Sequence, residues 1–363
     1  MRRCIIHTGL HKTGSSSLQN FLHLNSRRLL RAGILYPQAG RHLGRKPATQ
    51  HQFLVRSATR DPSNLHGDRP RLELESEIAA TAHETLIVSA EYISFQMFGA
   101  GNFAFPDYLA SLGYRVVLVT YVRPQAEMVV SKYTQRVKNM RSGESFAAFA
   151  DAVLGSRMHR YLAMREALAR RGLEGVFLPY NAALRREGIE LNFLRAALEL
   201  EGRLDADGRA RLVEELSRRV PPRRNESTGT IELALCRAIA REINADGALP
   251  QAQTQVLYNV VSSVLKRSWS YRDQKYSMLT ADLIDRAEAL HGADNRRFAL
   301  AEWGRGWEEV FGRPEPAPAN DLEVAPAPAL LRSFERLLPR VRRQVLKRLA
   351  QRRADIDAPR AAE

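Results

Sequence analysis

The chain is organised around residues 4–18, Cys-Ile-Ile-His-Thr-Gly-Leu-His-Lys-Thr-Gly-Ser-Ser-Ser-Leu. A short apolar run from Cys4 to Ile6 predicts a buried strand, and a loop of glycine, lysine, threonine and serine follows it. A helix comes next, because apolar residues recur at helical spacing at Leu18, Phe21, Leu22, Leu29 and Ala32. Converging N–H groups, the helix dipole and the charge of Lys12 would make this junction a cradle for an anion.

The spacing of this loop differs from that of the loop that binds nucleoside triphosphates. That loop reads G-x-x-x-x-G-K-[ST], and its lysine contacts the β- and γ-phosphates. Here Gly9 and Gly14 have the required separation, but Ser15 follows Gly14 and the lysine is at position 12. The loop therefore suits a phosphate-like group other than the triphosphate of a kinase or GTPase. The alternative is a plain Gly/Ser turn with a surface lysine.

Composition limits the class of protein and of partner. The 363 residues are enough for one large α/β domain or two smaller ones. An excess of 55 basic over 40 acidic residues predicts an anionic partner: nucleic acid, a membrane surface, or a phosphorylated or sulfated ligand. Two cysteines provide neither a disulfide framework nor a metal cluster, and we find no apolar stretch of signal-peptide or transmembrane length. We therefore expect a cytoplasmic protein without a metal.

The order of elements predicts an α/β fold with a parallel sheet covered by helices on both faces. After the first strand, further strands are expected at 85–89, 115–122 and 175–179. Residues 36–72 are rich in Pro, Gly, His and Arg, which predicts a long, partly helical excursion over the active face. The helices expected between and after the strands lie near 73–83, 103–112, 125–137, 144–171, 190–200 and 206–219, with several more up to about residue 311.

The C-terminal part of the chain is predicted to lie outside the main domain, which would cover 1–312. Residues 313–329 contain five prolines and predict an extended linker. Residues 330–363 form a basic tail in which one helix carries nine basic residues and one acidic residue. Its apolar stripe would dock on a membrane or a partner, or would pack back on the domain. That stripe consists of Leu330, Phe334, Leu337, Val341, Val345 and Leu349.

A second motif, residues 121–133, places two phosphate-binding side chains near each other. Arg123 ends the strongest strand, and Ser131 lies eight residues later on the following helix, a rise of about 12 Å at most. An arginine fork and a serine hydroxyl could bind one phosphate together. Alternatively, Arg123 has a structural role at the end of its strand.

Taken together, the two motifs resemble those of sulfotransferases that use 3′-phosphoadenosine 5′-phosphosulfate (PAPS), in the bacterial branch that acts on glycans. The first, H-x-G-x-x-K-T-G-[ST]-[ST], resembles the loop that binds the 5′-phosphosulfate, and Arg123-x₇-Ser131 resembles the site of the 3′-phosphate. The resemblance covers about residues 1–312 and implies a P-loop-like sheet. It implies that PAPS is held by His11, Lys12, Thr13, Gly14, Ser15, Ser16 and Ser17 at one end and by Arg123 and Ser131 at the other.

Glu91 follows the strand at 85–89, at the edge where open α/β sheets place their sites. In the glycan-directed branch a glutamate at the corresponding position acts as general base, so the resemblance implies that Glu91 takes the proton of the acceptor. Otherwise it is a helix N-cap or an ion-pair partner of Lys12. His51 and His11 are the other candidates for the base, and His11 could instead orient the donor.

Further along the chain the resemblance adds three cofactor-binding residues. Tyr180 corresponds to a tyrosine near the adenine. Arg223 and Arg224 precede an Asn-Glu-Ser stretch that bacterial members carry, and they would complete the 3′-phosphate pocket in the absence of the family's Arg-Lys-Gly loop. The implied reaction is in-line transfer of a sulfuryl group to a hydroxyl or amine of a glycan or glycolipid. Lys12 would neutralise the leaving oxygen.

Two other classes stay open at this stage. One is a nucleotide or small-molecule kinase with a P-loop, and the other is a non-catalytic basic protein that binds membranes or nucleic acid. For the sulfotransferase we expect no nucleic-acid partner, and the basic tail would bring it to the inner face of the membrane. The sequence does not identify the acceptor, although the Arg- and His-rich region 36–72 favours a polar, acidic or lipid-linked sugar.

Overall fold

The computed structural model of the chain describes residues 1–10, 13–43, 48–221, 228–245, 249, 254, 257–268 and 273–357, with side chains up to residue 351. The chain divides into two compact units, and neither is continuous in sequence. We call them the sheet unit (Met1–Pro124, Ser156–Arg224 and His291–Arg313) and the helical unit (Gln125–Gly155, Asn225–Leu290 and Pro314–Glu363). The predicted boundary at 312 lies one residue from the unit boundary after Arg313, and no unit boundary lies near 329. Residues 1–312 are shared between two units, and the tail belongs to the second.

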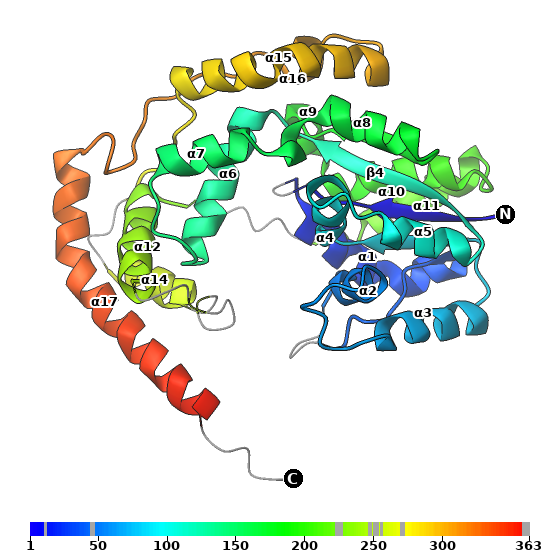
Figure 1. Ribbon diagram of the computed structural model, residues 1–363, viewed down its shortest axis with the longest axis horizontal. Coiled ribbons are helices and arrows are strands. Elements are labelled where there is room, and N and C mark those ends of the chain that lie inside the picture. The colour runs from blue at the N-terminus through cyan, green and yellow to red at the C-terminus, as the bar shows by residue number, and fades with distance from the viewer. Residues whose placement is uncertain are drawn as a thin grey trace. The chain divides into compact units, whose positions relative to one another are not determined.

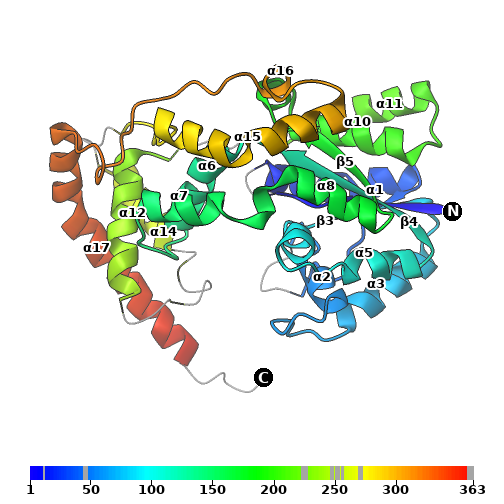
Figure 2. The same cartoon turned by 45° about the horizontal axis from the view of Figure 1, so that its top comes forward.

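The sheet unit contains five parallel strands in the order β2-β3-β1-β4-β5 (Figures 1 and 2). The α/β fold with a parallel sheet is thus confirmed. In the central register, Ile5 of β1 lies opposite Ile87 of β3 and Val117 of β4. Four of the strands were predicted, and the fifth, β2, has only two residues. The bounds are β1 (Arg2–His7), β2 (Ile34–Leu35), β3 (Thr85–Ser89), β4 (Tyr114–Val122) and β5 (Glu174–Pro179).

Successive side chains along the strands point to opposite faces of the sheet, and each face has a hydrophobic core. Ile5 packs into one core with helices α1 (Ser15–Arg31), α10 (Ile189–Glu201) and α11 (Ala206–Ser217). Cys4 and Ile6 face the other core, as the two-residue period of a strand requires. That core is covered by α2 (Gln52–Ala58), α3 (Arg69–Ala80), α5 (Ala104–Ser111), α8 (Tyr161–Arg170), the last part of α15 (Ala281–Trp303) and α16 (Trp307–Phe311).

Several short elements of the sheet unit were not predicted. After β3 the chain forms α4 (Tyr92–Ser94) and the single π-helical turn η1 (Phe95–Gly99). The predicted helical stretch 144–171 is divided among α7 (Phe146–Leu154), the 3₁₀ turn η2 (Arg157–His159) and α8, and α9 (Ala182–Glu187) lies between β5 and α10. The elements α4, η1, η2 and α9 have six residues or fewer, too few for a periodic apolar pattern to identify them.

The helical unit is built from α6 (Gln125–Lys138), α7, α12 (Thr230–Ile243), α14 (Leu257–Lys266), the start of α15 and α17 (Pro328–Asp357). Helix α17 lies along α12 and α14 (Figure 1). Its apolar stripe forms part of the core of this unit, through Leu330, Leu337, Val341, Val345 and Leu349. Of the two predicted roles of this helix, packing on the body of the protein is the one that the structure has. The stripe is therefore not available to a membrane.

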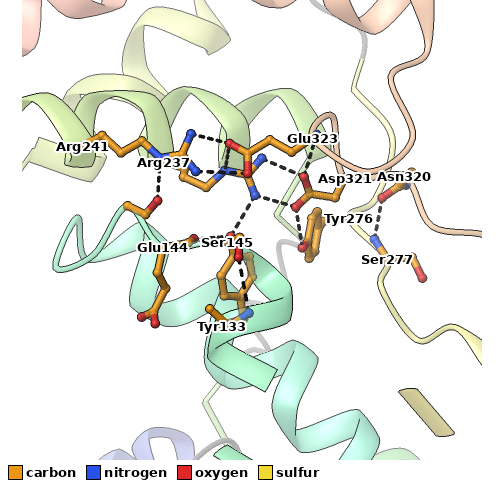
Figure 3. Close-up of polar contacts among 12 residues, drawn as sticks. Tyr133, Glu144, Ser145, Arg237, Arg241, Tyr276, Ser277, Asn320, Asp321 and Glu323 are labelled. Atoms are coloured by element: carbon orange, nitrogen blue, oxygen red, sulfur yellow. Dashed lines mark hydrogen bonds and ion pairs between the residues drawn. The ribbon is translucent and has the colours of Figure 1, made fainter. Parts of the chain in front are cut away.

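The proline-rich segment before α17 is packed against the helical unit, whereas an extended linker was predicted. The N–H of Ala317 donates to the carbonyl of Leu279 at 2.8 Å, and the N–H of Asn320 donates to that of Ser277 at 3.1 Å. Asp321 is buried and binds Arg237 of α12 through both carboxylate oxygens (Figure 3). Prolines prevent regular structure in this segment, but its backbone and acidic side chains still find partners. In the described part of the chain, no helix is both long enough and apolar enough to cross a bilayer.

Candidate functional site

Three neighbouring strands are tied together by side chains where they end. The N–H of Thr8, just after β1, donates to the carbonyl of Val119 of β4 at 3.1 Å. The hydroxyls of Thr8 and Thr120 are 2.8 Å apart, and on the other side of β1 His7 Nδ1 lies 2.8 Å from the hydroxyl of Ser89 of β3. All these groups are buried. The carboxyl ends of β1, β3 and β4 therefore form a fixed platform under the loop that follows β1.

The loop between β1 and α1 has the conformation that its glycines allow. Gly9 has φ +53° and Gly14 has φ +82°, both in the left-handed region that favours glycine. Gly14 is the N-cap of α1, and its carbonyl accepts hydrogen bonds from the N–H groups of Ser17 at 3.0 Å and Leu18 at 3.2 Å. The buried hydroxyl of Thr13 donates to the carbonyl of Leu10 at 2.7 Å. The predicted ligands His11 and Lys12 lie outside the described residues.

The three serines that begin α1 differ in what their hydroxyls do. Ser15 is 2% exposed, and its Oγ has no hydrogen-bond partner among the described residues. Ser16 is exposed. The Ser17 hydroxyl donates to a carboxylate oxygen of Glu190, which is buried at the start of α10. The Ser15 hydroxyl is thus unbonded within the described residues, while that of Ser17 is tied to α10.

Glu91 lies directly beside this loop. A Cβ atom added at Gly9 would come within 3.0 Å of Ser15 Oγ and within 3.1 Å of Glu91 Cγ. Glu91 occupies the N-cap position of α4 but makes no capping hydrogen bond with its side chain. The predicted general base is therefore next to the predicted anion-binding loop, and Gly9 is the residue that lets the two approach.

His7 was not predicted to have a role. It is the last residue of β1, directly before the loop to α1, and the structure describes it. Its ring is fully buried, and Nε2 has no hydrogen-bond partner among the described residues. Burial lowers the pKa of His7 to about 4, and the nearby charge of Glu91 opposes this shift. The imidazole is therefore neutral at pH 7. The sequence feature that could have singled out His7 is its place in the motif H-x-G at the end of a strand.

His51, predicted as another candidate for the base, has a structural environment instead. Its ring is fully buried, Nε2 donates to the carbonyl of Pro37 at 2.9 Å, and Nδ1 accepts from the N–H of Ser89 at 3.2 Å. Burial, with a smaller effect of the Arg41 charge, lowers its pKa to about 3. With both nitrogens used, His51 has no lone pair for the acceptor's proton, so we assign it to holding Pro37 next to Ser89 of β3.

Arg123 and Tyr180 come together at the ends of β4 and β5. The guanidinium carbon of Arg123 lies 5.6 Å from the centroid of the Tyr180 ring, within cation–π range, and Arg185 is at 5.9 Å from the same ring. The Tyr180 N–H donates to the carbonyl of Val122 at 2.7 Å, and the buried Tyr161 hydroxyl donates to that of Arg123 at 2.6 Å. Two residues predicted to bind the same nucleotide are thus neighbours.

Of the three remaining predicted ligands, one lies in the helical unit and two lie outside the described residues. Ser131 lies on α6 in the helical unit, whereas Arg123 belongs to the sheet unit, so their joint binding of one phosphate stays a prediction. Arg223 and Arg224 lie outside the described residues. No three His, Cys, Asp or Glu side chains of the described residues are grouped as a metal site requires.

Searches against protein-family models, curated proteins and solved structures found no match to this chain. The site is therefore interpreted from its own geometry.

Proposed function

We propose that the chain is a sulfotransferase that transfers the sulfuryl group of PAPS to a hydroxyl or amine of a glycan or glycolipid. The observation that carries this proposal is the arrangement around Gly9. The Ser15 hydroxyl, which has no hydrogen-bond partner among the described residues, and the side chain of Glu91 both lie against Gly9 of the predicted anion-binding loop. A kinase loop would have lysine where this chain has Ser15, so the loop favours a phosphosulfate over a nucleoside triphosphate.

The residues that would hold the donor lie at the carboxyl edge of the sheet, where open α/β sheets bind ligands. The N-terminus of α1, with Gly14 as its N-cap, would bind the anion as helix N-termini generally can, and the Ser15 hydroxyl would add a further donor. At the adenosine end of the donor, the charge of Arg123 would bind the 3′-phosphate and the ring of Tyr180 would lie near the adenine. The donor is the substrate that supplies the sulfuryl group, and the chain supplies its position and charge complementarity.

In the proposed reaction, the sulfuryl group is transferred in one in-line displacement. The acceptor oxygen attacks sulfur as the bond between sulfur and the bridging oxygen breaks, and that oxygen leaves with the electron pair on 3′-phosphoadenosine 5′-phosphate. Glu91 takes the proton of the acceptor, and Lys12 neutralises the leaving oxygen. His7 is neutral behind the loop and positions its end through Ser89. Each role is a proposal that one substitution can test.

Binding is tested first, by the shift in melting temperature with a panel of nucleotides. We expect stabilisation by 3′-phosphoadenosine 5′-phosphate and none by ATP or GTP. A ligand at 100 times its Kd adds about 2.7 kcal/mol to stability, which a thermal scan resolves. Stabilisation by ATP or GTP alone would favour the kinase and overturn the proposal.

Catalysis is tested with Glu91→Gln in an assay of labelled sulfate transfer to a panel of glycans. Loss of a general base lowers turnover by roughly 10²- to 10⁴-fold, while donor binding stays within a few fold of the original. The control is Glu166→Gln, an exposed glutamate of α8, which should leave both unchanged. If Glu91→Gln turns over like the control, Glu91 is not the base.

The shared phosphate site is tested with two variants and two ligands. Arg123→Gln and Ser131→Ala should both weaken binding of 3′-phosphoadenosine 5′-phosphate. Neither should affect binding of adenosine 5′-phosphosulfate, which lacks the 3′-phosphate. An equal loss with both ligands would show that these residues contact another part of the donor.

A further inference from the structure

A groove in the helical unit, between α14 and α17, has a lining that the proposed reaction does not use. It has a volume of about 460 Å³. Among the described residues, three arginines, three uncharged polar residues and two valines line it, and none of these residues is acidic: Arg267, Arg340, Arg348, Asn259, Ser263, Gln344, Val260 and Val264. The three arginines are exposed to solvent.

The spacing of these residues gives the groove a direction. On α17, Arg340, Gln344 and Arg348 follow each other at intervals of four residues, so they share one face of the helix. Eight residues of helix separate the two arginines by about 12 Å along the axis. On α14, Asn259 and Ser263 have the same interval, and Arg267 continues it just beyond the helix end. The groove therefore offers charges at intervals, with uncharged polar groups between them.

The charge of the groove contrasts with that of the neighbouring surface of α17. Arg342 forms a two-pronged pair with Glu242 of α12, with N···O distances of 2.7 to 2.9 Å. That pair neutralises the arginine beside the groove. The groove itself holds three positive charges, and no carboxylate lies among the described residues of its lining, so the arginines repel one another and attract an anion.

The groove's chemistry distinguishes among anionic partners. The apolar stripe of α17 is buried in the core, so a lipid surface would meet only the charged face. Single-stranded nucleic acids bind grooves that offer aromatic rings for stacking, and none of the described residues that line this groove is aromatic. Arginine forks bind carboxylate and sulfate groups, while serine, asparagine and glutamine exchange hydrogen bonds with hydroxyls. Alternating acidic groups and hydroxyls are the chemistry of an acidic polysaccharide.

We propose that the groove between α14 and α17 binds a segment of an acidic polysaccharide that carries sulfate or carboxylate groups. This site is separate from the residues proposed to hold PAPS, and it does not depend on the chain being a sulfotransferase. Arg340 and Arg348 bind two acidic groups of the segment, Arg267 binds a third, and the polar residues between them contact sugar hydroxyls.

The test measures binding of a fluorescent heparin octasaccharide to the full chain by anisotropy at 150 mM salt. The variant Arg340→Gln/Arg348→Gln should weaken binding at least tenfold and reduce the salt dependence by about two charges. The matched control, Arg332→Gln/Arg336→Gln, removes two exposed arginines of the same helix that are outside the lining and should change affinity less than twofold. All four side chains are exposed, and unchanged circular dichroism confirms folding.

Two further probes decide the class of partner: a single-stranded oligonucleotide of the same charge, and vesicles containing anionic phospholipid. Weaker binding of both, with no effect of the groove variant, supports the proposal. Equal losses for the groove pair and the control pair would mean that diffuse charge attracts the polysaccharide, and would overturn it. Tighter binding of the oligonucleotide or the vesicles through Arg340 and Arg348 would also overturn it.

Discussion

Removing the carboxylate of Asp321 should strongly destabilise the helical unit. Asp321 and Arg237 are both nearly inaccessible, with side chains 1% and 3% exposed. Their two N···O contacts are both 2.7 Å, and the carboxylate also accepts from the Tyr276 hydroxyl at 2.9 Å and from the Glu323 N–H at 2.9 Å (Figure 3). Asp321→Ala therefore removes four hydrogen bonds and leaves a buried guanidinium with less compensation.

The size of the effect follows from what remains around Arg237. Breaking a buried ion pair by deleting one partner costs about 3–5 kcal/mol. Arg237 keeps a contact of 3.1 Å between Nε and Glu323, and Nη1 still donates to the Tyr133 hydroxyl at 2.8 Å. These contacts moderate the loss, so we expect about 3 kcal/mol. Glu323→Ala is the matched control. Its carboxylate is 35% exposed, so its loss should cost about 1 kcal/mol or less.

The measurement is urea unfolding followed by far-UV circular dichroism at pH 7, with the slope of the transition checked for each variant. A third variant, Arg237→Met/Asp321→Leu, removes the whole pair and should be more stable than Asp321→Ala alone, because no charge is left buried. The reasoning is refuted if Asp321→Ala costs no more than Glu323→Ala, or if the double variant is the least stable of the three.

The same pair gives the effect a pH dependence. Burial opposes ionisation of Asp321, but the hydrogen bonds and charge of Arg237 outweigh it and hold the pKa of the carboxyl below its usual value. Because the folded pKa lies below the unfolded one, this stabilisation is complete above the unfolded pKa of about 3.9 and is lost as the pH falls through the folded pKa. The difference between the original chain and Asp321→Ala should therefore be constant from pH 5 to 8 and shrink in strong acid.

Two further predictions concern the two units separately. His7 and His51 have pKa values of about 4 and about 3, below the unfolded value of 6.5, so their stabilising effect is complete above pH 6.5 and falls as the pH drops toward those values. At pH 5 each of these two histidines should lower the free energy of unfolding by about 2 kcal/mol relative to its value above pH 6.5. In denaturant titrations, the stability of His7→Gln should therefore fall less with acid than the stability of a variant at the partly exposed His66. Deleting residues 314–363 removes Asp321 and the five buried side chains of the α17 stripe, roughly 10 kcal/mol of apolar burial. Limited proteolysis should then cut within the helical unit, and a truncated chain that resists protease like the full one would contradict this.

The sequence predicted the parts of the fold whose pattern is local. The continuous apolar run of β4 and the run at 85–89 are typical of buried parallel strands, and both strands are where the pattern predicted them. By contrast, the two residues of β2 are too few to show a period. The role of the C-terminal helix could not be decided, because an apolar stripe needs a partner and the sequence does not show which surface covers it.

Prediction of the site had a similar limit. The glycine positions and the strand-to-helix junction followed from spacing, and the place of Glu91 after the strand at 85–89 put it at the same edge of the sheet, where it lies against Gly9. The engagement of Ser17 by Glu190 could not be predicted, since 173 residues separate them. His51 was chosen for its chemistry, but its two nitrogens are used by backbone groups that come near only after folding. Residue type indicates which hydrogen bonds and proton transfers a side chain can make. Tertiary contacts decide which of its donors and acceptors remain available.

The hydrogen bonds beneath the loop fix the strand end from which the proposed anion-binding site begins. The contacts of His7 with Ser89 and of Thr8 with Thr120 link β1 to both neighbouring strands, and all four groups are buried. The loop therefore begins from a rigid position, and Gly14 fixes its other end as the N-cap of α1. For the proposed donor, these fixed ends would reduce the conformational entropy lost on binding. We therefore expect the affinity of the proposed site to depend on the strand ends as well as on the loop residues that would contact the anion.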